Sequence, residues 1–547
     1  MIKPAAWRSY LASIDWQLLV FLLLFLDVKM LVKLGAVMVC FILLRLNKQS
    51  LSFRLKELPM FYPLVIIISI LVAISTALFV NVKYDIVLAT GILFWLLCLF
   101  ACAFVKHSVE TKQTETIHRT ILLFICLNAL VSISTFISII IETGSLNPYL
   151  YQGNHQKYFI GTGDYIRGIT FDTSTTNAII NALGLIYFLG KNKYGMVITC
   201  MAVMLMAGSN MANGLLLLIF IWMLLFGTNR NQKSIIVVCL LMLTIFLLKV
   251  SPQNNRYIAE TWQRIFRPGK PLPSLWIVKK DTPIILKPDS ILSGEERKQK
   301  QALLYLDSLA ALKEIKTVSK TIASIPVNTG GKPVVPGDSI HTPLFQHLED
   351  TGRINKKLAG YIRENQSPLS IAIQTQPQPR LPGKLIGLKQ VVDFYKDHPF
   401  KILFGAGAGN FSSKLAFRAT ALGIMGGYPE KLAWISPDFK SHHLDLYLAY
   451  YAKYDGLHSV TNSPNSVYAQ LLSEYGLAGL LIFIVGYINF FVKKIRWLSY
   501  GKYMLLFMLG AFFMEYWFEQ LSVVVLLELF LFLDIKENQK AAADNAN

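Results

Sequence analysis

The sequence predicts an all-α polytopic membrane protein with about 12 transmembrane helices (10–12) and one large, mostly helical or irregular extracytoplasmic loop. Three observations predict it. The 547-residue chain is 54% hydrophobic and only 16% charged, whereas soluble domains carry roughly 25% charged residues. Continuously apolar runs of about 15–24 residues recur along the chain, and such runs cross a bilayer core as helices. A polar, basic stretch, 251–466, separates these runs into two groups.

The N-terminal membrane domain, 1–250, is expected to hold about nine spans. They are 16–28, 31–46, 62–80, 86–105, 120–141, 176–190, 195–209, 212–227 and 234–250. The C-terminal membrane segment, 467–535, holds two to three, at 467–492, 503–518 and 520–533, before the tail 536–547. The first pair and the last pair are short for a bilayer of about 30 Å, so each pair reads equally well as one kinked helix.

Basic residues predict how these spans are oriented. With twelve spans and a cytoplasmic N-terminus, the inside segments hold 19 Lys and Arg, whereas the short outside segments hold 5. Because cytoplasmic loops are enriched in Lys and Arg, this asymmetry predicts that both termini are cytoplasmic and that the 251–466 loop lies on the outer face. We therefore expect a multi-pass membrane protein.

The 251–466 loop is basic, with 28 Lys and Arg against 17 Asp and Glu. This charge favours anionic partners such as lipid head groups or a lipid-linked diphosphate, and a solvated basic surface is the plainer interpretation. Nucleic acid is not expected at this location. Apolar residues at helical spacing predict amphipathic helices over 301–316 and 385–396. All six cysteines fall in apolar spans and none has metal-ligand spacing, so no metal or cofactor is expected.

A glycine series, Gly405, Gly407 and Gly409, follows the second amphipathic helix. A dinucleotide site would need a strand before it, and a Walker loop would need Gly-Lys-Ser/Thr after it. Neither context is present. The glycines instead predict a tight turn whose bare backbone approaches a ligand or a neighbouring helix.

Several segments carry a resemblance to a known family. The 403–411 segment, LFGAGAGNF, resembles the FGxGxGNF segment of the O-antigen ligase and O-antigen (surface polysaccharide) polymerase superfamily. The 465–479 segment, NSVYAQLLSEYGLAG, is similar to that family's signature at the entry to the span after the large loop. The 165–172 segment, YIRGITFD, resembles its Arg-Gly-Phe element. The resemblance implies a GT-C-like fold, a place in a bacterial inner (plasma) membrane with the large loop in the periplasm, and glycosyl transfer from a polyprenyl-diphosphate donor.

The chain departs from the family pattern at three positions. Asn465 stands where the family usually has His, Asn210 where it has Arg, and Lys384 where relatives often have Arg. If that His activates the acceptor hydroxyl, Asn465 can orient a hydroxyl but cannot take its proton. His458 and the pair His442/His443 are alternative sources of an imidazole, and surface histidines are the plainer interpretation.

Transfer requires the leaving diphosphate to be held and its charge stabilised. No carboxylate cluster suggests a metal, so Arg and Lys are the natural means. The expected diphosphate-binding residues lie at the membrane face. They are Arg167, Arg256, Arg264 and Lys384. For the arginines, interfacial snorkelling is the structural alternative. Glu474, at the start of an apolar span, is expected to orient a basic residue or cap the helix.

These observations predict a metal-independent membrane glycosyltransferase that ligates or polymerises lipid-linked oligosaccharide at the periplasmic face. Its partners would be the polyprenyl-diphosphate-linked glycan donor, a glycan, lipid or protein hydroxyl acceptor, and membrane lipids. The alternatives are a lipid-linked glycan transporter or flippase, and a non-catalytic envelope-assembly subunit. Ion-coupled carriers keep ionisable groups within their spans. Spans three to nine contain almost none, which favours the enzyme.

Overall fold

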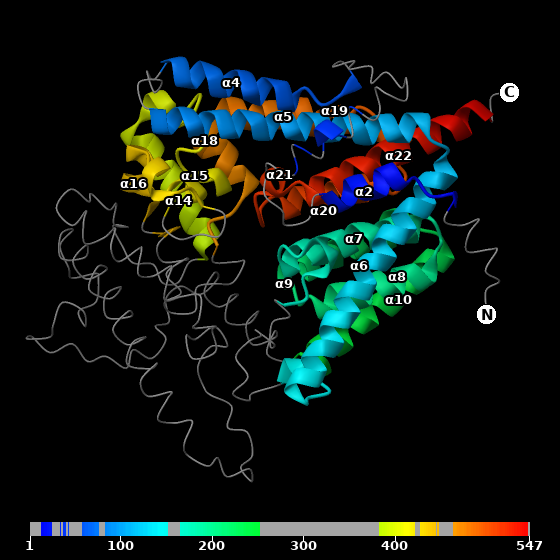
Figure 1. Ribbon diagram of the computed structural model, residues 1–547. Coiled ribbons are helices and arrows are strands. Elements are labelled where there is room, and N and C mark those ends of the chain that lie inside the picture. Colours follow the sequence, from blue (N-terminus) through cyan, green and yellow to red (C-terminus); the bar gives the residue numbers. More distant parts are fainter. Residues whose placement is uncertain are drawn as a thin grey trace, which may run out of the picture.

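The chain folds into a bundle of helices, as the computed structural model in Figure 1 shows. The structure describes residues 12–24, 57–75, 82–150, 165–251, 382–421, 427–444, 446–447 and 463–544, with isolated positions between 33 and 42. Within these residues there are helices and turns but no strand. The predicted amphipathic helix over 301–316 lies outside the described residues.

The helices of the N-terminal half precede the large loop. They are α2 (Trp16–Leu24), α4 (Phe61–Ser75), α5 (Val82–Thr111), α6 (Thr114–Thr143), α7 (Ser174–Gly190), α8 (Tyr194–Met206), α9 (Asn210–Phe226) and α10 (Arg230–Ile245). The remaining helices follow residue 382. They are α14 (Gly383–Asp397), α15 (Lys414–Ala419), α16 (Pro437–His442), α18 (Val467–Ile482), α19 (Asn489–Val492), α20 (Gly501–Ala511), α21 (Trp517–Gln520) and α22 (Ser522–Asp544). The helix predicted over 385–396 is confirmed as α14.

Four of the described helices are long and apolar enough to cross a membrane. They are Val82–Thr111, Thr114–Thr143, Arg230–Val250 and Val467–Val492. Four shorter apolar helices accompany them, at Phe61–Ile74, Tyr194–Met206, Asn210–Phe226 and Gly501–Ala511. The helical membrane class is therefore confirmed in this coarser form, and the count of ten to twelve spans stays a prediction.

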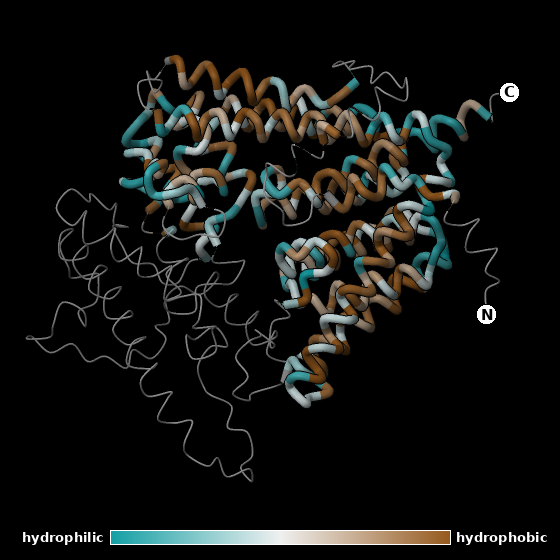
Figure 2. The backbone as a smooth tube through the Cα atoms, viewed as in Figure 1, coloured by the Kyte–Doolittle hydropathy of each residue, from teal (hydrophilic) through white to brown (hydrophobic). Residues whose placement is uncertain are grey.

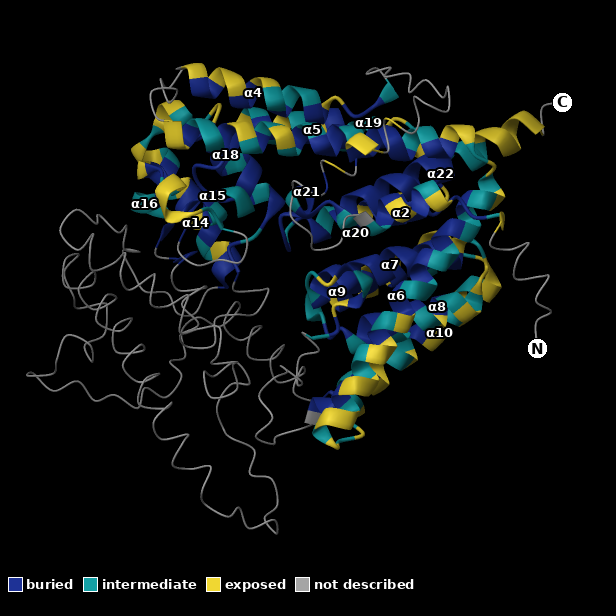
Figure 3. Cartoon of the chain, in the orientation of Figure 1, coloured by how far each residue is buried: buried dark blue, intermediate teal, exposed yellow. Residues whose placement is uncertain are grey.

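Two helices form the centre of the bundle. α22 is buried from Val523 to Ile535 and packs against α5, α7 and α20. α7 is buried along nearly its whole length, and both helices are dark blue in Figure 3. Outward faces of other helices carry exposed apolar side chains, including Trp222 (50%) and Leu241 (58%). The tube in Figure 2 is correspondingly brown along the bundle and teal near its ends. Such an outer surface suits lipid rather than water.

The bundle has two ends with different contents. At the first, which we call the loop end, α14, α15 and α16 pack beside the start of α18 (left in Figure 1). At the second, the tail end, α22 finishes beside the end of α5 (right in Figure 1). From Ser522 to Glu537 α22 rises about 22 Å at 1.5 Å per residue. This length separates the polar groups at the two ends.

Two predicted spans are interrupted at the loop end. α20 ends at Ala511, rather than continuing to residue 518, because the chain turns through 512–516 before α21 begins. α18 is broken at Gly476, whose φ of 67° and ψ of −164° are not helical. Both breaks leave backbone groups without a helical partner, and other segments bind them instead.

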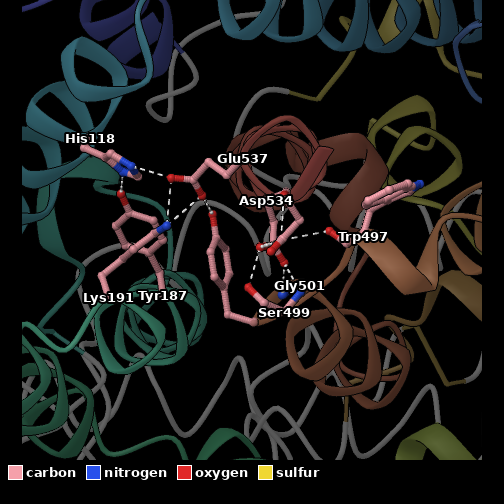
Figure 4. A network of polar contacts seen from close by, with 10 residues as sticks. His118, Tyr187, Lys191, Trp497, Ser499, Gly501, Asp534 and Glu537 are labelled. Carbon is pink, nitrogen blue, oxygen red and sulfur yellow. Dashed lines mark hydrogen bonds and ion pairs between the residues drawn. The ribbon is translucent and has the colours of Figure 1, made fainter. Parts of the chain in front are cut away.

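Polar side chains at the tail end form a closed network (Figure 4). Glu537 accepts hydrogen bonds from His118 Nε2 at 2.6 Å, from Lys191 Nζ at 2.7 Å and from Tyr500 OH at 3.3 Å. Asp534 beside it accepts from the backbone N–H groups of Ser499 and Gly501, each at 2.7 Å. We call this set the tail-end cluster. It ties α6 and α7 to α22 and the start of α20.

Candidate functional site

The glycine turn binds the break in α18. At the break, the carbonyls of Ser473 and Glu474 accept hydrogen bonds from the N–H groups of Ala406 (2.8 Å) and Gly407 (2.9 Å). In return, the N–H groups of Leu477 and Ala478 donate to the carbonyls of residues 402 and 403, each at 2.9 Å. The interrupted helix would otherwise bury unpaired backbone groups. The sequence prediction of a turn approaching a neighbouring helix is confirmed.

This contact requires glycine on both sides. Gly405, with φ of 74°, lies so close to α18 that an added Cβ would stand 2.4 Å from the carbonyl carbon of Glu474. A Cβ on Gly476 would stand 2.4 Å from the carbonyl oxygen of Leu403. Gly407 and Gly409 also have positive φ, at 92° and 72°. The glycine series is therefore explained by the approach of two backbones.

Glu474 fixes the same turn with its side chain. Its Oε2 accepts from Gly409 N–H at 2.8 Å and its Oε1 from Phe411 N–H at 3.2 Å. The residue is 1% exposed, so both carboxylate oxygens are used inside the protein. This geometry gives Glu474 a positioning role in place of the helix cap or basic partner expected from the sequence.

Lys384 joins three segments. It is 2% exposed, and its Nζ donates to Ser463 Oγ (3.1 Å), to the carbonyl of Asn465 (2.5 Å) and to the carbonyl of Met514 (2.6 Å). An ammonium has three donors, and all three are bound. Burial lowers the pKa of Lys384, and the nearby charge of Glu515 opposes that shift. The Lys384 side chain therefore ties α14 to the segment before α18 and to the turn after α20, and it has no donor left for a phosphate.

Asn465 is paired with a carboxylate that the sequence did not single out. Its Nδ2 donates to Glu515 Oε2 at 2.8 Å, from the start of α18 to the turn after α20. Its Oδ1 is buried and has no hydrogen-bond partner among the residues that the structure describes. Glu515 is 6% exposed. Because an amide does not titrate, Glu515 is the proton acceptor of this pair.

A second amide–carboxylate pair lies one turn along α18. Gln470 Nε2 donates to Glu519 Oε1 at 2.5 Å, and Leu415 N–H donates to Glu519 Oε2 at 2.9 Å. Gln470 is 2% exposed, and its Oε1 has no partner. Gln520, beside Glu519, also has a buried Oε1 without a partner. We call Asn465, Gln470, Glu515, Glu519 and Gln520 the loop-end cluster.

Cations flank this cluster. The charges of Lys384 and Lys414 act on Glu515, and so does the opposing charge of Asp172. Lys414 and Arg418, both on α15, act on Glu519. α15 begins at Ser413, whose side chain accepts from Ala416 N–H and so caps the helix. The loop-end cluster thus combines carboxylates with cations from a different element.

Arg167 lies on the turn that leads into Asp172. Its guanidinium is exposed and packs over the Tyr165 ring at 5.3 Å. Among the described residues it has no carboxylate partner. Asp172 accepts a hydrogen bond from Thr176 Oγ1 at 3.0 Å, while the N-cap of α7 is Thr173. Since the charge of Asp172 acts on Glu515, the Arg167 turn belongs to the loop end.

Buried amides fix the Arg167 turn. Asn128 Oδ1 accepts from Ile169 N–H at 2.9 Å, and Asn177 Nδ2 donates to the Ile166 carbonyl at 2.9 Å. The two amides bond to each other at 2.8 Å. Gly168, with φ of 65°, fits between them, because an added Cβ would stand 2.3 Å from Asn128 Oδ1. Arg167 is therefore presented from a rigid support.

His442 and His443, the loop-end histidines proposed from the sequence that the structure describes, are both held by protein contacts. His443 is fully buried, stacks on Phe417 and bonds Gln390 Oε1 through Nδ1 at 2.8 Å. Burial lowers its pKa to about 3, so it is neutral at physiological pH. His442 Nε2 bonds Asp397 at 2.9 Å. His458, Arg256 and Arg264, which the sequence also proposed, lie outside the described residues.

Sequence reasoning missed Glu515 and Glu519. The available signal was two acidic residues, four positions apart, inside an otherwise apolar segment. Ionisable groups in such segments usually face a cavity or a partner. Lys414 and Arg418 were missed because nothing in the sequence separates them from other basic residues of the loop.

Comparison of the chain with family models, with curated proteins and with solved structures finds no match. The resemblance to the ligase and polymerase superfamily therefore stays an expectation, and the loop-end geometry is the basis for the proposed function.

Proposed function

We propose that this protein is an integral-membrane glycosyltransferase acting on polyprenyl-diphosphate-linked oligosaccharide at the periplasmic face. The observation that carries the proposal is the loop-end cluster. It combines a buried carboxylate (Glu515) and a half-buried one (Glu519) with amide oxygens that have no partner among the described residues and with flanking cations, at one end of an apolar bundle. Hydroxyl-rich, anionic lipid-linked substrates need this combination of acceptors and cations in one place.

In this proposal the donor diphosphate binds to cations that are not already used. Arg167 is exposed on a rigid turn, and Lys414 and Arg418 are partly exposed on α15. Arg gives bidentate, permanently charged contacts to phosphate. Lys384 is excluded from this role, since its donors bind protein oxygens. Arg256 and Arg264 stay predictions from the sequence.

The proposed reaction forms a glycosidic bond between an acceptor hydroxyl and the donor's anomeric carbon. The bond between that carbon and the diphosphate oxygen breaks, and its electron pair leaves with the lipid diphosphate. Fixed cations stabilise the charge that grows on the leaving group. The 19-to-5 distribution of basic residues supports a periplasmic loop end. The acceptor is either another lipid-linked repeat or a separate lipid or protein hydroxyl.

Replacing Arg167 tests the donor site. Arg167→Ala is expected to reduce transfer about 10²- to 10³-fold, because one charged stabiliser of the transition state is removed. The assay would use proteoliposomes, a polyprenyl-diphosphate glycan and chromatographic separation of products. Arg167→Lys should recover only part of the rate, since the bidentate contact is lost.

Arg496→Ala is the matched control. Arg496 is also exposed, and its guanidinium also packs over a neighbouring aromatic ring, 4.9 Å from the Trp497 centroid. It belongs, however, to the turn that packs against the tail-end half of α22. It should leave transfer unchanged. Full activity of Arg167→Ala would refute the donor site. Movement of the donor across the bilayer without any glycosidic product would instead identify a carrier.

A further inference from the structure

The strongest unexplained feature of the loop end is a repeated pairing. Two amides, one just before α18 and one near its start, each donate to a carboxylate of the 512–520 segment: Asn465 to Glu515 at 2.8 Å and Gln470 to Glu519 at 2.5 Å. Donation to a carboxylate fixes which atom of each amide is nitrogen, because carboxylate oxygens only accept. In both pairs the remaining amide oxygen is buried without a partner. Each pair therefore leaves one amide oxygen that needs a hydrogen-bond donor.

The two carboxylates differ in how fully they are bound. Glu519 has both oxygens engaged, by Gln470 and by Leu415 N–H. Glu515 has Oε2 bound by Asn465, and no donor among the described residues reaches its Oε1. Within the described part of the chain, Glu515 thus keeps an unbound carboxylate oxygen in addition to the Asn465 oxygen that needs a donor. A hydroxyl-bearing ligand supplies donors to both.

We propose that the loop-end cluster is the acceptor-sugar subsite, with Glu515 as the general base and Asn465 as its positioning residue. This inference rests on the proposed glycosyl transfer and deepens it. An acceptor hydroxyl donates to Glu515 Oε1, and neighbouring sugar hydroxyls donate to the unpartnered oxygens of Asn465 and Gln470. The subsite fits a polyhydroxylated acceptor rather than a single isolated alcohol.

The chemical step balances with these groups alone. The acceptor O–H proton passes to the Glu515 carboxylate as the acceptor oxygen bonds to the anomeric carbon. The carbon–diphosphate bond breaks and the diphosphate takes its electrons. Glu515 then loses the proton to solvent. Asn465 cannot titrate, and it holds the Glu515 carboxylate through its side-chain N–H. With Glu515 as the base, no histidine is needed at position 465.

The test compares Glu515→Gln with a nucleophile that needs no base. Glu515→Gln is expected to slow transfer to a sugar hydroxyl about 10²- to 10⁴-fold, the usual contribution of a general base. Azide is already an anion, so at high concentration it should form glycosyl azide in the variant at a rate close to that of the wild type. Donor affinity, measured by tryptophan fluorescence titration, should be unchanged and reports that the variant is folded.

Asp393→Asn is the matched control. It makes the same carboxyl-to-amide change at the loop end, on a side chain that is 40% exposed and, among the described residues, pairs with Lys396, and it should leave both rates unchanged. Loss of the azide reaction together with hydroxyl transfer, with the donor still bound, would overturn the assignment of Glu515 as base. So would full transfer activity in Glu515→Gln. Absence of any transfer by the wild type would refute the proposed function itself, which is a separate outcome.

Discussion

The two polar clusters of the bundle differ in whether their polar atoms find hydrogen-bond partners within the protein. At the tail end, Glu537 and Asp534 receive donors from His118, Lys191 and the start of α20, and none of the polar atoms drawn in Figure 4 is buried without a partner. At the loop end, Asn465, Gln470 and Gln520 each keep a buried oxygen without a donor. Buried polar atoms are normally paired, and exceptions need an explanation. In our proposal the satisfied cluster stabilises the fold, whereas the unsatisfied one binds the acceptor.

The largest expected effect on stability comes from the glycine turn that supports the loop-end cluster. Gly405→Ala should lower the unfolding temperature strongly and reduce the folded yield, because its Cβ would overlap the backbone at Glu474 and the residue has positive φ. Gly144→Ala is the control, since Gly144 has a φ of 65° but nothing within 4 Å of its Cβ position. Thermal unfolding in detergent measures both. Equal losses would mean that φ strain alone matters and that the close approach does not.

The next prediction tests whether Lys384 has a structural role or binds the substrate. Lys384→Met should cost about 2–4 kcal/mol of folding free energy, because three buried oxygens lose their donor. The donor KM of the remaining folded protein should stay the same. A raised donor KM with normal stability would restore the diphosphate role predicted from the sequence. The measurement pairs chemical unfolding with initial rates at varied donor concentration.

A smaller effect is expected at the tail end. Glu537→Gln should destabilise the protein by about 1.5–3 kcal/mol, the range for hydrogen bonds to a charged group. Burial would raise the pKa of Glu537, but hydrogen bonds from His118 and Lys191 and their charges outweigh it, so the pKa is lowered. A lowered folded-state pKa gives stability that is present above the unfolded value near 4.5 and is lost as pH falls below it. The wild type should therefore lose more stability on acidification than Glu537→Gln. Matching pH profiles for the two proteins would contradict this interpretation.

The sequence predicted the elements that depend on local pattern. Apolar runs located the long helices, the spacing of Leu388, Val391 and Tyr395 predicted α14, and the glycine series predicted a close backbone approach. The break in α18 was not predictable, because Gly476 lies inside a mostly apolar run, and its non-helical conformation accompanies a contact with the distant turn after α14.

The candidate site depended on contacts between distant segments. Asn465 and Glu515 are 50 residues apart, and Lys384 binds oxygens 79 to 130 residues away. Sequence reasoning could therefore identify Asn465 as unusual but not the carboxylate that accompanies it. For the same reason it assigned Lys384 to phosphate, since a buried lysine with three protein acceptors looks like any other lysine in the sequence.

The most direct test of the division between the two clusters is the rate of glycosyl transfer per folded molecule, measured for Glu515→Gln and Glu537→Gln side by side. Both variants change one hydrogen-bonded glutamate to its amide, and both are measured in proteoliposomes with the same lipid-diphosphate donor and hydroxyl acceptor. We predict that Glu515→Gln loses about 10²-fold or more in rate at near-normal stability, while Glu537→Gln keeps its rate and loses stability. Equal rates in the two variants, or the reverse pattern, would contradict the division between an unsatisfied active cluster and a satisfied structural one.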